Sequence, residues 1–131
     1  MRGLDTNVLA RFLLRDDEAQ FRRAERVVDA AAAAGEALRL DVMVLCELVW
    51  VLRAGYGRER AEIADALDAL LDAAPFAVDD REAVRAAVTA FRAGRGDFSD
   101  YLIALRNRHA GCRDTVTFDR KLRPEDGFAA P

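Results

Sequence analysis

The feature of this sequence that most limits its possible folds is an alternation of short apolar runs with longer segments of helical periodicity. Strands are predicted for the short runs Met1–Leu4, Ala37–Leu40, Phe76–Val78 and Asp114–Phe118. Strands that alternate with helices require βαβ crossovers, which pair the strands in parallel. We therefore expect an α/β protein, a single three-layer α/β/α domain with a mainly parallel central sheet.

Between these runs, apolar residues recur at three- and four-residue steps, which is the spacing of one helix face. Gly35 and Gly111 follow two of these segments and are typical helix stops. The chain of 131 residues is long enough for one domain with a core and too short for two, so residues 1–131 are predicted to form one domain. Its end, about residues 124–131, is expected to be a loose tail. The helical segments are Glu18–Ala34, Val42–Ala54, about Ile63–Leu71, about Val84–Phe91 and Asp97–Ala110.

The amino-acid composition limits the classes of function that this chain can have. With 20 basic and 23 acidic residues the formal charge is -3, which argues against nucleic-acid binding through bulk positive charge, although a local basic rim is compatible with it. No apolar run is long enough to span a membrane, and no signal peptide is recognisable, so we expect a cytoplasmic protein. Cys46 and Cys112 lack the spacing of a zinc site, and His109 is the only histidine. Any chemistry must therefore depend on carboxylates.

Acidic residues stand where a parallel sheet gathers its ligands, at the carboxyl ends of strands. Asp5 follows the first predicted strand, and Asp119 follows the last. Asp97 and Asp100 open the helix that precedes that last strand. We take these positions as candidates for one acidic site.

Glu47 is a further candidate because it interrupts the apolar run Val42–Leu52. We expect it to be at least partly buried, and a buried carboxylate needs a cation, a hydrogen-bond donor or a proton. A cluster of oxygen donors without histidine or thiolate suits a hard ion such as Mg²⁺ or Mn²⁺.

Each candidate also has a purely structural interpretation. Asp5 could cap the first helix, and Asp97 with Asp100 has the spacing of a reciprocal capping box. Asp119 could cap a final turn, and Glu47 could be a surface residue. Taken singly, none of these positions identifies a function.

Taken together, the segments resemble the PIN-domain ribonucleases, and most of all the toxins of VapBC-type toxin–antitoxin pairs. The likeness covers nearly the whole chain. Its order and spacing are carried by Met1–Leu9 with its Asp-Thr-Asn, Leu45–Leu52 around Glu47, Asp97–Ala104 and Thr117–Asp119. One mild departure is that Leu-Ile-Ala-Leu at 102–105 replaces a commoner run ending in two alanines.

The resemblance implies a Mg²⁺- or Mn²⁺-dependent endoribonuclease that cleaves RNA, with a VapB-type antitoxin as partner and a homodimer as the usual assembly. By position, Asp5, Glu47 and Asp100 fall on the family's three central acidic residues, and Asp119 falls on the more variable fourth. These four are the expected catalytic and metal-binding residues. Thr6 or Asn7 is expected to orient them, and Asp97 to act as helix cap or outer support. Candidates for contacting RNA phosphates are Arg15, Arg95, Arg106 and Arg120.

Two other classes of function stay open. A phosphotransfer module of receiver or phosphatase type also places aspartates at strand ends, but the phosphatase type needs a second Asp where Asn7 stands, and Lys121 fits the receiver type poorly. In a non-catalytic α/β binding module the carboxylates would be caps alone. Site-specific Mg²⁺ or Mn²⁺ binding separates these possibilities.

The predicted helix Val42–Ala54 is apolar on nearly all sides. Leu45, Leu48, Val49 and Leu52 form the stripe that should face the sheet, whereas Met43 and Trp50 lie on another side. A helix of this kind is deeply buried or shared with another chain. We expect the Trp50 side to join an antitoxin groove or a dimer contact.

Overall fold

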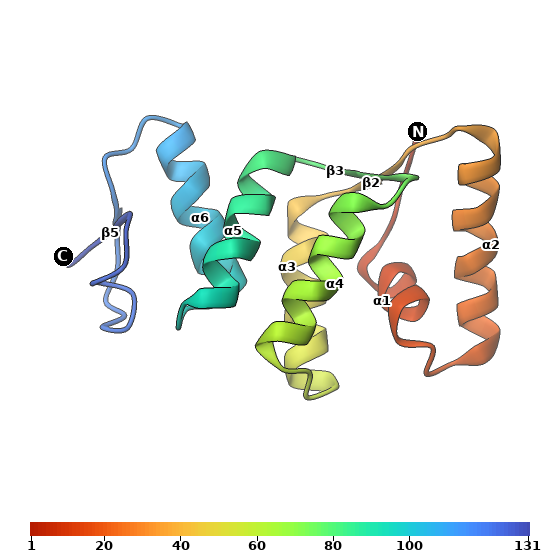
Figure 1. Cartoon of the computed structure of the whole chain (residues 1–131), viewed down its shortest axis with the longest axis horizontal. Coiled ribbons are helices and arrows are strands. Elements are labelled where there is room, and N and C mark those ends of the chain that lie inside the picture. The colour runs from red at the N-terminus through yellow and green to blue at the C-terminus, as the bar shows by residue number, and fades with distance from the viewer. The chain divides into compact units, whose positions relative to one another are not determined.

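A computed structural model describes all residues, 1–131, and it divides the chain into two compact units, Met1–Arg81 and Glu82–Pro131. Each unit is described by itself below, and Figure 1 labels the elements of both. No helix combines the length and the apolarity that a membrane span requires.

The first unit is built on a three-stranded parallel sheet with β2 in the middle, in the order β1-β2-β3. In register, Arg2 lies opposite Leu38, and Leu38 lies opposite Phe76. The helices run between the strands, as parallel pairing requires. The elements are β1 (Arg2–Gly3), α1 (Thr6–Leu14), α2 (Glu18–Ala34), β2 (Leu38–Leu40), α3 (Val42–Trp50), the π-helical segment Val51–Gly55, α4 (Arg60–Asp72) and β3 (Phe76–Val78).

Aspartates begin three of these helices. Asp5, Asp17 and Asp41 each occupy the N-cap with extended backbone, and each side chain accepts a hydrogen bond from a backbone N–H of the first turn. At the other end of α2, Gly35 adopts φ 65°, the left-handed conformation that glycine tolerates best, and ends the helix as predicted.

The core of the first unit is formed by the apolar faces of its helices. α2 packs beside α1, where the rings of Phe12 and Phe21 stack with centroids 6.3 Å apart (Figure 1). The predicted stripe is buried, with Leu45, Leu48 and Val49 of α3 and Leu52 of the π-helical segment all 6% exposed or less. On the other side of this helix Met43 is 70% and Trp50 71% exposed, so the predicted division of its faces is confirmed.

The second unit consists of two helices and a small parallel sheet. Phe91 and Phe98 are fully buried and meet edge to face at 6.4 Å, joining the end of one helix to the start of the next. The elements are α5 (Arg81–Ala93), α6 (Phe98–His109), β4 (Thr115–Val116) and β5 (Phe128–Ala129), with β4 and β5 paired in parallel.

The structure differs from the sequence prediction in several elements. The helix predicted for Val42–Ala54 changes after Trp50 into the π-helical segment. The strand predicted for Asp114–Phe118 is reduced to Thr115–Val116. The tail expected to be loose contains β5, whose pairing with β4 holds it in place.

Candidate active site

The carboxyl ends of all three parallel strands of the first unit lie on one edge of its sheet, and each is followed by an aspartate. Asp5 comes two residues after β1, Asp41 directly after β2, and Asp79 directly after β3. In open α/β sheets this edge is where ligands bind. Of these three aspartates, only Asp5 is among the carboxylates that the sequence predicts for chemistry.

Arg39 on β2 pairs with two of the three. Its guanidinium lies 3.1 Å from the Asp41 carboxylate and hydrogen-bonds both oxygens of Asp79. The hydrogen bonding and charge of Asp79, and then the charge of Asp41, raise the pKa of Arg39 above its ordinary value. These two carboxylates therefore serve an ion-pair network. Their position after a predicted strand is the signal that could have drawn attention to them.

Asp5 takes no part in that network. Its Oδ1 accepts a hydrogen bond from the Asn7 N–H at 3.3 Å, so the helix-cap interpretation is confirmed. The side chain is exposed, and only this one of its two oxygens takes part in a hydrogen bond. The second oxygen is available to a ligand.

Thr6 connects this helix start to Glu47. It is the buried polar residue of the core, 5% exposed, and its Oγ1 donates to Glu47 Oε2 at 3.2 Å. This contact joins the first residue of α1 to a residue of α3 that is 41 positions away. The first unit thus brings Glu47 beside the residue that follows Asp5.

The expected burial of Glu47 is wrong, because its side chain is exposed. The reason is the helical period. The buried positions of α3 are Val42, Leu45, Leu48 and Val49, and Glu47 stands outside that stripe. Its carboxylate reaches solvent and can meet a ligand without the cost of burial.

In the second unit, Asp97 and Asp100 form the reciprocal capping box that their spacing predicts. The Asp97 N–H donates to Asp100 Oδ2 at 2.9 Å, and the Asp97 side chain accepts from the N–H of Asp100. Both residues are half-buried. Asp100 still has one oxygen outside the box.

Asp119 lies three residues after β4 and is held by a turn. Its Oδ1 accepts from the Lys121 N–H at 2.9 Å, and its own N–H donates to Thr117 Oγ1 at 3.0 Å. The predicted cap of a final turn is confirmed. Here too, one carboxylate oxygen stays outside any hydrogen bond.

The chemistry of these four side chains fits a divalent cation. Asp5, Glu47, Asp100 and Asp119 offer only carboxylate oxygens, the donors that Mg²⁺ and Mn²⁺ prefer, and each has one oxygen committed and one open. Neither unit alone gathers three or more His, Cys, Asp or Glu side chains into a group that could hold a metal ion. The fit of these residues to a divalent cation therefore rests on the type of their ligand atoms, which are carboxylate oxygens.

One arginine suggested for RNA contact has a defined place. The Arg15 guanidinium lies 4.0 Å from the centroid of the Phe21 ring, a cation–π contact that fixes its position at the end of α1. It remains a candidate for phosphate binding, as do Arg95, Arg106 and Arg120 in the second unit.

Comparison with known proteins adds independent findings. A family model described as PIN domain matches residues 4–124, a range that contains all four candidate carboxylates. A VapC ribonuclease of Aquifex aeolicus (strain VF5) is 29% identical over 123 residues, which cover 94% of this chain and 90% of that protein. No solved structure matches the chain.

Proposed function

Because this chain belongs to the PIN-domain family, we propose that it is an endoribonuclease, a hydrolase of RNA phosphodiester bonds that acts as the toxin of a toxin–antitoxin pair. The observation that carries the proposal is the similarity to a VapC ribonuclease along nearly the whole chain. Family membership also agrees with the predicted fold class, a three-layer α/β/α PIN fold with parallel strands. We further propose that the two units act as one PIN domain.

The residues proposed for catalysis and metal binding are Asp5, Glu47, Asp100 and Asp119. Each is an oxygen donor with an uncommitted oxygen. A divalent ion held by them would supply a lowered pKa for an attacking water and charge neutralisation on the phosphate. Glu47 is exposed, and its second oxygen could accept the proton of that water.

Neighbouring groups support these carboxylates. The Thr6 hydroxyl fixes one oxygen of Glu47, so Thr6 acts as a positioning residue. Asp97 supports Asp100, because its N–H donates to Asp100 Oδ2 and its side chain accepts from the Asp100 N–H at the start of α6. A polyanionic substrate would meet repulsion from four carboxylates, so positive charge from metal and from arginines is needed for RNA to approach.

The proposed partner is an antitoxin of the VapB type. An RNA-cleaving toxin would harm its own cell unless inhibited, and RNA would be met in the cytoplasm, the location that we propose. Met43 and Trp50 supply an exposed apolar surface on α3, which we call the Trp50 face. Exposed apolar patches of this kind mark contacts with other chains. The antitoxin or a second copy in a homodimer would cover this face.

The test is cleavage of a labelled RNA by the purified chain with Mg²⁺ or Mn²⁺, with EDTA as the control. We expect cleavage that needs metal and that falls by roughly hundredfold or more in Asp100→Asn, because losing a ligand or proton acceptor costs on the order of 10²–10⁴ in rate. Full activity in Asp100→Asn at saturating Mn²⁺ would remove that residue from the site.

The capping geometry also favours a second candidate, a non-catalytic binding module in which the carboxylates only hold helices. This candidate expects no site-specific metal affinity. Calorimetric titration of Mn²⁺ into the native protein and into Asp100→Asn distinguishes the two. Loss of a specific binding event in the variant supports the nuclease, and identical weak heats in both proteins support the binding module.

A further inference from the structure

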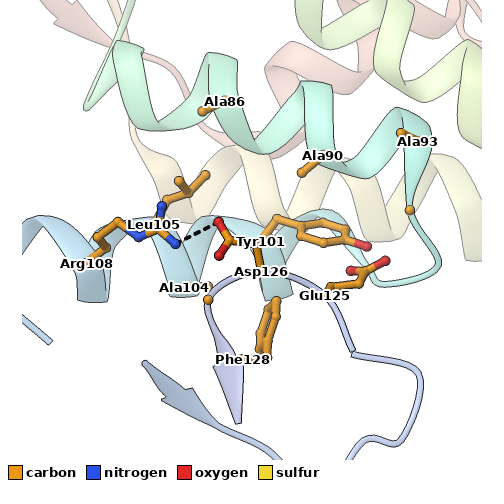
Figure 2. Close-up of a pocket in the computed structure, with 12 residues that line it drawn as sticks. Ala86, Ala90, Ala93, Tyr101, Ala104, Leu105, Arg108, Glu125, Asp126 and Phe128 are labelled. Atoms are coloured by element: carbon orange, nitrogen blue, oxygen red, sulfur yellow. Dashed lines mark hydrogen bonds and ion pairs between the residues drawn. The ribbon is translucent and has the colours of Figure 1, made fainter. Parts of the chain in front are cut away.

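The second unit contains a cavity of about 320 Å³ that none of the proposed catalytic carboxylates lines. It lies between α5, α6 and the C-terminal segment, as Figure 2 shows. The volume is at the lower end of the roughly 300–1,000 Å³ of small-molecule sites. Its apolar wall consists of Ala86, Ala90, Ala93, Ala104, Leu105 and Phe128.

One end of this cavity is polar and tightly organised. The Tyr101 hydroxyl accepts from the Gly96 N–H at 2.9 Å and is hydrogen-bonded to the Glu125 carboxylate. Figure 2 shows the phenol and this carboxylate side by side. A Cβ on Gly94 would stand only 2.0 Å from the hydroxyl oxygen, so a glycine at this position makes room for the pair.

Glu125 uses only one of its two oxygens in these contacts. Its Oε1 accepts from the Arg95 N–H at 3.3 Å, whereas its Oε2 is buried and has no hydrogen-bond partner. Leaving a buried charged oxygen unpaired costs more free energy than leaving a neutral group unpaired. Because Glu125 lines the cavity, the cavity contains a carboxylate with one unpaired oxygen.

The charges around the cavity favour a cation as that donor. Arg108 is paired with Asp126 at 2.9 Å, a contact marked in Figure 2, so these two charges balance. Burial, and then the hydrogen bond to Glu125, raise the pKa of Tyr101, which keeps the phenol neutral. Among the residues that line the cavity, the remaining charge is that of Glu125.

We propose that this cavity binds a small organic cation, an ammonium or guanidinium group on a short apolar body, with the Glu125 carboxylate as its acceptor. The apolar body would lie along the alanines of α5 and against the Phe128 ring. A charge-assisted hydrogen bond inside a cavity is stronger than a neutral one and selects the cation over an uncharged analogue. This proposal does not depend on the proposed nuclease function.

The experiment compares probes of equal shape and different charge on the native protein. n-Butylamine, n-butanol and butyrate are titrated separately while amide chemical shifts are followed by NMR. We expect butylamine to shift the amides of Gly94, Gly96 and Gly127 and to bind about tenfold or more tightly than butanol. Butanol binding as tightly as butylamine, or no movement of these amides with any probe, would overturn the proposal.

A further arm identifies the source of the cation. N-acetyl-lysine N-methylamide carries the same ammonium group on a peptide. Binding equal to that of butylamine supports recognition of a side chain from another protein. Binding of butylamine alone supports a free amine as the ligand.

Two variants with the same change in net charge locate the site. Glu125→Gln keeps the shape and should weaken butylamine binding by roughly tenfold to hundredfold. Glu82→Gln, an exposed position in the first turn of α5, is the matched control and should bind as the native protein does. Equal affinity in the two variants refutes the assignment. If Glu125→Gln does not fold, the comparison of amine with alcohol on the native protein still decides.

Discussion

Two substitutions separate the role of Asp5 as a helix cap from its proposed role in the chemistry. Asn caps a helix about as well as Asp but carries no charge, whereas Ala removes both properties. The bond to be lost in Ala is long, 3.3 Å from the Asn7 N–H, so its contribution lies at the low end of the usual range. We expect Asp5→Ala to cost about 0.5–1 kcal/mol of stability and Asp5→Asn less than about 0.5 kcal/mol.

Asp17 provides the matched control for this experiment. It caps α2 through a 3.0 Å bond from the Gln20 N–H and lies outside the proposed site. Asp17→Ala should cost about 1 kcal/mol, which lowers the melting temperature by roughly 3–5 °C in a chain of this size. Its RNA cleavage at a temperature well below melting should be unchanged.

Activity then distinguishes the two roles. If Asp5 acts in the chemistry, Asp5→Asn loses roughly hundredfold or more in cleavage rate while its urea denaturation midpoint stays near that of the native protein. Retained cleavage in Asp5→Asn, together with destabilisation in Asp5→Ala, would show that Asp5 is a cap alone. That outcome would refute the reasoning from donor chemistry.

Three further predictions concern other parts of the chain. Asp97→Asn should retain far more RNA cleavage than Asp100→Asn, because Asn preserves the cap; equal losses would place Asp97 among the direct ligands. Replacing Met43 and Trp50 together by Ser should weaken binding of the antitoxin measured by calorimetry without lowering the melting temperature, since both side chains are exposed; unchanged affinity places the contact elsewhere. The pKa of Tyr101 is raised in the folded state by burial and by a carboxylate, so its contribution to stability is present below the unfolded value of about 10 and is lost as the pH rises through the folded value. Tyr101→Phe should therefore lose less stability than the native protein as the pH rises above about 10 in urea denaturation, and parallel curves would contradict the shift.

Elements with strong local signals could be predicted from the sequence. α2 spans Glu18–Ala34 and β3 spans Phe76–Val78, both as predicted. In α2 the apolar spacing predicts the helix and the following Gly35 predicts its end, so these local signals favour the same structure. The capping box of Asp97 and Asp100 is another local pattern that the structure reproduces.

Features that depend on distant partners could not be predicted. β5 has two residues, too few to show a period, and it exists because β4 pairs with it. The ion pair between Arg39 and Asp79 joins positions 40 residues apart, and no local sequence pattern around either residue predicts that the two will pair. The exposure of Glu47 could not be predicted from its apolar neighbours, because the apolar content of a segment does not specify which side of the helix a residue occupies.

The ambiguity between cap and catalyst has a physical basis, because both roles need a short carboxylate at the start of a helix or turn. The observed hydrogen bonds make the two roles compatible, since each uses one oxygen and leaves the other. They also reduce the side-chain freedom that ligand binding would have to remove. Asp100 and Asp119, held at 2.9 Å, are better fixed in this sense than Asp5 at 3.3 Å. A carboxylate oriented by the backbone can thus be a better ligand because it is a cap.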